Sequence, residues 1–261
     1  MRKILFTLLT LVAMTACSKS EQKALVLYYS QTGTTQAVAE EIQSQLGADI
    51  ERFDVVDPYT GDFNATIARS QAETAHGITP ALAAIQSDLS KYDVIFLGYP
   101  IWFGTYAPPV KALLEANDFS SKTIVPFCTF GSGGLNTSAA DLVQALPESK
   151  IAEGYGVRTA RVAAAADELN RFLIENGYKE GKIKALPKYS AFKSVTAETA
   201  AIFDTACSSY QFPLGTPFEV CSREVPGGME YLFNVESSGS RSKIYVIALD
   251  GQDPEFTQVV R

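Results

Sequence analysis

Two hydrophobic patterns alternate along residues 23–180. Short runs of consecutive apolar residues are typical of strands buried on both faces, whereas apolar positions repeated every three or four residues are typical of amphipathic helices. The predicted strands cover residues 23–29, 49–55, 91–98, 123–129 and 151–158. The predicted helices lie around residues 38–46, 65–74, 108–114, 138–146 and 167–176. Strands that alternate with helices in this way predict a parallel α/β sheet.

The pattern changes after Pro187. One predicted helix is followed by four short strands, and Gly- and Ser-containing turns separate them. The helix covers residues 196–209, and the strands cover residues 216–224, 230–236, 243–249 and 256–260. A helix followed by an antiparallel meander predicts a small α+β domain over residues 187–261, separate from a main domain over residues 23–180.

The first 22 residues have the pattern of an export signal and a tether. Arg2 and Lys3 precede an apolar run over residues 4–13, which is too short to span a bilayer. The segment that ends at Cys17 resembles a bacterial lipobox, so we expect residues 1–16 to be a signal peptide, Cys17 to be lipidated and residues 17–22 to be a tether. The alternative is a plain signal peptide that contains a cysteine. A lipidated chain would sit at the cell envelope, on the periplasmic face or at the outer membrane, and would contact the membrane only through its anchor.

The charge balance argues against a nucleic-acid partner. The chain has 22 basic and 29 acidic residues, a net charge of −7, and removal of the signal would take away Arg2 and Lys3 to leave −9. A nucleic-acid binder needs a basic face. With one histidine, His76, and four cysteines, the chain is poorly supplied for a metal site, and we expect none. In an oxidising compartment Cys207 and Cys221 could form a disulfide, whereas an apolar strand makes Cys128 an inert core residue.

Three loops each follow the carboxyl end of a predicted buried strand, which is where open parallel sheets bind ligands. The first, residues 30–35, carries four hydroxyl side chains around Gly33 and opens a helix. Its backbone N–H groups and the helix dipole could bind a phosphate. It lacks the Gly-Lys-Ser/Thr of a P-loop and the spaced glycines of a dinucleotide fold. The alternative is a Ser/Thr-rich turn that caps its helix well.

The second loop, residues 98–106, places aromatic side chains between two glycines. It holds the only tryptophan, Trp102, followed by Phe103. Large rings in a ligand crevice are suited to stacking on a flat heterocycle. The alternative is that both rings pack under the following helix. In the third loop, the glycines of residues 131–134 could bring backbone amides against the edge of the same ring.

These three loops resemble those of the flavodoxin family, over about residues 23–175. The resemblance implies a doubly wound, five-stranded parallel sheet with strand order 2-1-3-4-5, a bound FMN and electron transfer. The phosphate would be held by Ser30, Gln31, Thr32, Gly33, Thr34 and Thr35. The isoalloxazine ring would be lined by Pro100, Ile101, Trp102, Phe103 and Gly104. The third loop would contribute Phe130, Gly131, Ser132, Gly133 and Gly134. Phe103 stands where relatives often have a second tryptophan, so its stacking role is the least fixed.

An FMN electron carrier needs no catalytic side chain, because the cofactor carries the redox chemistry. We therefore expect no catalytic residue, and we expect a redox partner protein with a basic docking face that complements the acidic chain. Two alternatives remain. One is an enzyme, an NAD(P)H-dependent FMN reductase that acts on quinones or flavins. The other is a non-redox scaffold or interaction protein.

The C-terminal domain resembles cystatin in its helix followed by a meander. Residues 223–227 partly match the cystatin hairpin motif Gln-x-Val-x-Gly, but Arg223 replaces the glutamine. Protease inhibition is therefore not carried over. An interaction module or a lid is the expected role, and a stabilising appendage is the alternative.

Overall fold

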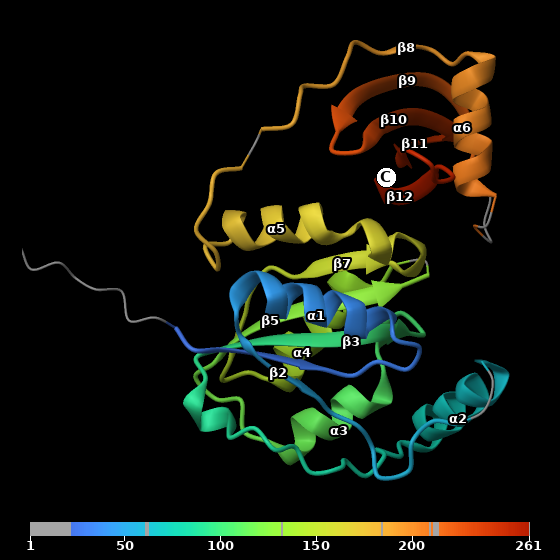
Figure 1. The fold of residues 1–261 in the computed structure, drawn as a ribbon. Coiled ribbons are helices and arrows are strands. Elements are labelled where there is room, and N and C mark those ends of the chain that lie inside the picture. Colours follow the sequence, from blue (N-terminus) through green and yellow to red (C-terminus); the bar gives the residue numbers. More distant parts are fainter. Residues whose placement is uncertain are drawn as a thin grey trace, which may run out of the picture.

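The structure is a computed structural model that describes residues 22–60, 63–131, 133–183, 185–208, 210 and 214–260. The predicted signal peptide, the lipidation site Cys17 and the predicted ligand residue Ser132 lie outside these residues. The described chain forms two sheets, one mainly parallel and one antiparallel (Figure 1). Within the described part of the chain, no helix is both long and apolar enough to cross a membrane.

The parallel sheet has the predicted strand order. Its main strands are β1 (Ala24–Tyr28), β2 (Asp49–Arg52), β3 (Val94–Trp102), β5 (Thr123–Phe130) and β7 (Tyr155–Arg158). They are arranged as β2-β1-β3-β5, with β7 and the short β6 (Lys150–Ile151) both beside β5. The predicted last strand is thus split in two. The additional strand β4 (Thr105–Tyr106) runs antiparallel to the end of β3.

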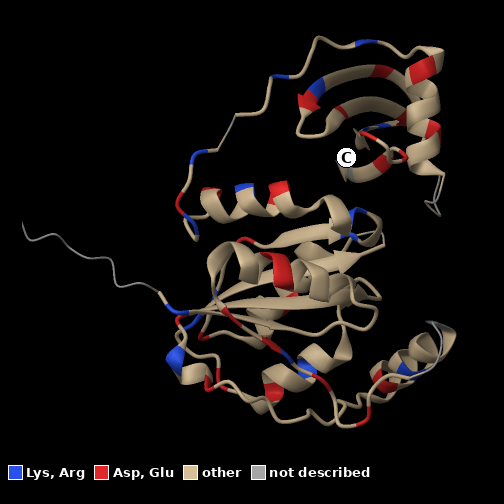
Figure 2. Cartoon of the chain, viewed as in Figure 1, with Lys and Arg blue, Asp and Glu red and all other residues tan. Residues whose placement is uncertain are grey.

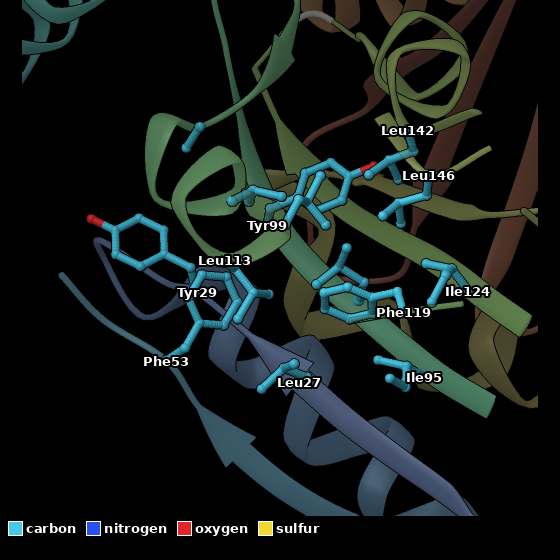
Figure 3. Close-up of a cluster of buried hydrophobic side chains, with 14 of the residues drawn as sticks. Leu27, Tyr29, Phe53, Ile95, Tyr99, Leu113, Phe119, Ile124, Leu142 and Leu146 are labelled. Carbon is cyan, nitrogen blue, oxygen red and sulfur yellow. The ribbon is translucent and has the colours of Figure 1, made fainter. Parts of the chain in front are cut away.

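Helices cover both faces of this sheet (Figure 1). Helices α1 (Thr34–Leu46) and α5 (Ala166–Glu175) pack on one face, and α3 (Pro108–Ala116) and α4 (Leu135–Ala145) pack on the other. Successive strand residues point to opposite faces, so consecutive apolar residues fill both cores. Val26 faces α1 and α5, whereas Leu27 faces α3 and α4 (Figure 3). Helix α2 (Phe63–His76) lies outside these layers (Figure 1). The 3₁₀ helix η1 (Leu89–Lys91) precedes β3, and the 3₁₀ helix η2 (Thr159–Ala164) follows β7.

The C-terminal sheet confirms the predicted helix and meander. Its elements are β8 (Lys193–Ser194), α6 (Ala197–Cys207), β9 (Thr216–Val225), β10 (Gly228–Ser237), β11 (Ser240–Leu249) and β12 (Glu255–Val260). The strands are in the order β12-β11-β10-β9-β8, and all pairs are antiparallel. A capping box between Thr196 and Thr199 starts α6. Phe203 of α6 packs edge-on against Phe233 of β10, with 5.1 Å between the ring centroids.

Cys207 and Cys221 are free thiols in the structure, so the disulfide that they could form is not present. Cys207 ends α6 and packs with the apolar cluster that contains Phe233. Cys221 pairs in register with Leu232, the residue before Phe233, and therefore points to the opposite face of the sheet. Burial raises the pKa of the Cys207 thiol to about 12. Cys128 is fully buried, as predicted.

Arg158 joins the two sheets. It is the last residue of β7, and its Nη1 donates a hydrogen bond of 2.9 Å to the carbonyl oxygen of Phe256 in β12. The same guanidinium lies 5.1 Å from the centroid of the Phe256 ring. Arg158 is also the register partner of Phe130, the first residue of the predicted third loop. The C-terminal sheet therefore contacts the parallel sheet beside one of the candidate ligand loops.

Candidate functional site

The three predicted loops meet at one edge of the parallel sheet. Tyr28, Gly98 and Phe127 are neighbours in register across β1, β3 and β5, so the chain leaves all three strands at the same edge. The first and third loops are joined by Thr35 and Thr129, whose hydroxyl oxygens are 2.8 Å apart. The second and third loops are in van der Waals contact, because a Cβ placed on Gly134 would lie 2.5 Å from Cγ2 of Ile101.

The first loop presents the N-terminus of α1. Gly33 precedes the helix in a left-handed conformation, with φ of +87°, which glycine adopts without strain. Within the described chain, no side chain caps this helix end, and its first turn holds no acidic residue. The hydroxyl of Ser30 accepts a hydrogen bond of 3.1 Å from the Gly33 N–H and closes the turn. An uncapped N-terminus of this kind can bind an anion through its backbone N–H groups.

The side chains of this loop divide into two groups. Thr32 is exposed and Thr34 is half-buried, with their hydroxyl oxygens 3.3 Å apart. Thr35 is buried and its hydroxyl is hydrogen-bonded to that of Thr129, so it anchors the loop to the end of β5. The amide of Gln31 also has structural partners, since it accepts from the Tyr29 hydroxyl at 2.5 Å and donates to the Tyr59 carbonyl at 2.8 Å. These contacts of Gln31 and Thr35 fix the position of the loop.

The second loop is a tight β3–β4 hairpin with an exposed aromatic tip. Phe103 and Gly104 form the turn, with φ of +52° and +86°, and the Phe103 side chain is 56% exposed. A left-handed phenylalanine is strained by roughly 1–2 kcal/mol, and strain of this kind often marks functional sites. Trp102 packs edge-on against Tyr29 and Tyr59. The alternative interpretation placed both rings under the following helix. The exposure of Phe103 shows that its ring is not covered in this way.

Side-chain bonds to α4 hold the hairpin in place. The hydroxyl of Thr105 in β4 donates to the carboxylate of Asp141 in α4. The hydroxyls of Tyr99 in β3 and Ser138 in α4 are 3.1 Å apart. Burial raises the pKa of Tyr99, so it stays protonated and can keep this bond. The site is thus built on strand ends whose positions are fixed by the helices.

Sequence reasoning missed the contribution of α2. Tyr59 precedes α2, is almost fully buried, and contacts Trp102 with 5.2 Å between the ring centroids. No local sequence signal links these two residues, because they lie 43 positions apart in a long connection and a loop. The single histidine, His76, ends α2 in an exposed position, with its Nδ1 2.7 Å from the Ala72 carbonyl oxygen. Among the described residues, no group of three or more His, Cys, Asp or Glu side chains could hold a metal ion.

Comparisons with known proteins agree with this geometry. The family model described as flavodoxin matches residues 23–175 and ends before the antiparallel sheet. No curated protein matches the chain. Among solved structures, a protein of Bacteroides uniformis ATCC 8492, provisionally described as a flavoprotein, is 26% identical with a TM-score of 0.53, over 58% of this chain and 97% of its own. A similarly described protein of Bacteroides eggerthii DSM 20697 is 31% identical with a TM-score of 0.49, over 57% of this chain and 98% of its own. A flavoprotein of Lactobacillus acidophilus NCFM, solved in complex with FMN, is 23% identical with a TM-score of 0.47. The match covers 57% of this chain and 99% of that protein.

Proposed function

The chain belongs to the flavodoxin family, and on that premise we propose that it binds FMN at the loop edge of its parallel sheet and carries electrons. One observation supports this most directly. The uncapped N-terminus of α1 and the exposed aromatic turn at Phe103 lie on neighbouring strands of the same edge. A ligand with a phosphate at one end and a flat heterocycle at the other fits both features. Bound FMN would supply the one- and two-electron chemistry.

The described residues fit the two ends of FMN in different ways. The phosphate would take the backbone N–H groups at the start of α1 and the hydroxyls of Thr32 and Thr34. No lysine or arginine lies between Lys23 and Arg52, so helix dipole and neutral donors would carry this contact. The ring would lie between the β3–β4 hairpin, with Trp102 and Phe103, and the backbone around Gly133 and Gly134. In this arrangement the protein orients the ring and excludes water from part of it.

We further propose that the carrier works at the cell envelope, through the lipid anchor expected at Cys17. Acidic residues occur along the elements of both sheets (Figure 2), and the net charge of −7 favours a redox partner with a basic docking face. Salt should weaken such docking. The NAD(P)H-dependent reductase remains the second candidate function, since the same loops would serve it.

A titration with FMN tests the proposal. The purified chain is mixed with FMN, separated from free FMN and examined by absorption spectroscopy before and after reduction with dithionite. We expect one tightly held yellow flavin per chain that bleaches on reduction. A chain that retains no flavin would refute FMN binding and support the scaffold alternative. Rapid oxidation of added NADH or NADPH by the flavin-loaded protein would favour the reductase over the carrier.

The Ser30 hydroxyl offers a first test of the phosphate loop. Ser30→Ala removes the acceptor for the Gly33 N–H and leaves the turn before α1 less fixed. A neutral hydrogen bond contributes about 0.5–1.5 kcal/mol, so we expect FMN to bind roughly two- to tenfold more weakly. Ser149→Ala is the matched control, because its hydroxyl donates to Phe119 away from the three loops. Equal FMN affinities of the two variants in calorimetric titrations would contradict this role of Ser30.

A further inference from the structure

Tyr59, Arg69 and Glu73 form a compact cluster that the sequence did not predict. The Tyr59 hydroxyl donates to the Glu73 carboxylate, and Arg69 Nε donates to the same carboxylate at 2.8 Å. The Arg69 guanidinium also lies over the Tyr59 ring, 4.1 Å from its centroid. Tyr59 is 5% exposed and Glu73 is 8% exposed, so these contacts are shielded from water. Hydrogen bonds to charged groups are stronger than neutral ones, and low exposure strengthens them further.

The cluster ties α2 to the segment before it. Arg69 Nη1 donates to the Pro58 carbonyl at 3.1 Å and forms an ion pair of 3.3 Å with Asp57. Arg69 and Glu73 are one turn apart on α2, so the helix offers both charges to Tyr59 at once. Burial and the bond to Glu73 raise the pKa of Tyr59 far above its usual range, which keeps the hydroxyl protonated as a donor.

Tyr59 also completes a closed set of contacts at the candidate site. Its ring meets Trp102 at an interplanar angle of 79°, and the Tyr29 ring meets Trp102 at 84°, with 6.1 Å between those centroids. Gln31 bridges the two tyrosines, because its amide accepts from the Tyr29 hydroxyl and donates to the Tyr59 carbonyl. The indole therefore makes edge-on contacts with two buried tyrosines. The residue that links them belongs to the phosphate loop.

We propose that Tyr59, fixed by Arg69 and Glu73, is a positioning residue that sets the orientation of Trp102 in the flavin site. The inference rests on the proposed FMN function and assigns a role to α2. Through Gln31 the same cluster couples the indole to the phosphate loop, so the two ends of the site are held at one spacing. Without the Glu73 charge, the side chain at position 73 can no longer accept from both Tyr59 and Arg69, and Arg69 loses its buried counter-charge. The Tyr59 ring would then be held less firmly against Trp102.

The chain contains a matched control for this cluster. In the C-terminal sheet, the Tyr189 hydroxyl donates to Glu230 at 2.7 Å, Arg223 pairs with Glu230 at 2.5 Å, and the Arg223 guanidinium lies 4.4 Å from the Tyr189 ring centroid. This second triad has the same three residue types, but it lies on a different sheet from Trp102. Tyr189→Phe and Glu230→Gln therefore repeat the chemistry of Tyr59→Phe and Glu73→Gln away from the site.

The experiment compares these four variants in the full chain. Trp102 is the only tryptophan, so its emission reports its surroundings without FMN. We expect Tyr59→Phe and Glu73→Gln to shift this emission to longer wavelength, to weaken FMN binding about tenfold and to reduce the quenching of bound FMN fluorescence. The Tyr189 and Glu230 variants should match the wild type in all three. Far-UV circular dichroism and melting curves identify a variant that has lost its fold, and Tyr59→Phe, which keeps the ring, carries the test if Glu73→Gln does not fold.

The outcomes separate the inference from the proposed function. Wild-type emission and wild-type FMN affinity in folded Tyr59→Phe and Glu73→Gln would overturn the inference. Equal losses in the Glu73 and Glu230 variants would also overturn it, because they would reflect general stability. If the wild type itself takes up no FMN, the proposed function fails. The emission of Trp102 without FMN then still shows whether Tyr59 positions the indole.

Discussion

Replacement of Gly134 by alanine is expected to weaken FMN binding roughly ten- to a hundredfold more than the same replacement of Gly133. The two glycines have nearly the same backbone, with φ of +124° and +122°, so alanine is similarly strained at both. The surroundings differ. A Cβ on Gly134 would lie 2.5 Å from Cγ2 of Ile101 and 3.1 Å from the Gly104 carbonyl oxygen, whereas among the described atoms nothing lies within 4 Å of a Cβ on Gly133.

The added methyl group at Gly134 would push the second and third loops apart, on the two sides of the proposed ring site. Overpacking of this kind costs about 1–3 kcal/mol, which converts to the expected affinity ratio. Titration of each variant with FMN, followed by flavin fluorescence, measures the difference. Gly133→Ala also has a positive φ but lacks the contact with Ile101, so the difference between the two variants measures the cost of that contact. Similar affinities in the two variants would show that the loops do not need this close approach.

The second large effect concerns folding and is expected from Gly98→Ala. Gly98 is the register partner of Phe127, and a Cβ on Gly98 would lie 2.1 Å from Cζ of that ring. Phe127 is fully buried against α1 and α5, so the ring has no free space to move into. We expect a loss of about 3 kcal/mol or more in the free energy of unfolding, measured by urea denaturation.

A compensating substitution tests the cause of that loss. Phe127→Leu shortens the side chain that fills the space beside Gly98, and the double variant should be more stable than Gly98→Ala alone. An additive or worse double variant would show that steric conflict with the ring is not the reason. The result bears on function as well, because β3 continues from Gly98 directly into the hairpin with Trp102 and Phe103.

The helices and strands that could be predicted are those that a local hydrophobic pattern determines. The apolar runs at residues 23–29 and 91–98 produced β1 and β3, because strands buried on both faces need consecutive apolar residues. The positions of the three loops followed, since parallel strands end at one edge. The two-residue strands β4 and β8 were not predicted, because so short a pairing leaves no hydrophobic period to detect.

Contacts between side chains that are distant in the sequence could not be predicted from local sequence patterns. Gln31 is expected at the phosphate, and no local pattern predicts that its side-chain amide also bonds to Tyr29 and to the Tyr59 backbone. A disulfide between Cys207 and Cys221 was one possibility, but Cys221 follows Val220 by one residue and therefore points to the face of the sheet opposite the α6 cluster. The contact between Tyr59 and Trp102 depends on where α2 lies, which no periodicity within α2 reveals.

The parallel direction of the main strands has a consequence for how the protein would face a membrane. Lys23 precedes β1 and therefore lies at the edge of the sheet opposite the three loops. With the lipid anchor proposed at Cys17, a tether over residues 17–22 reaches at most about 20 Å. So short a tether would keep the amino-terminal edge of the sheet facing the bilayer. The proposed flavin site would then face away from the membrane. A partner protein in the aqueous phase could bind there without displacing lipid.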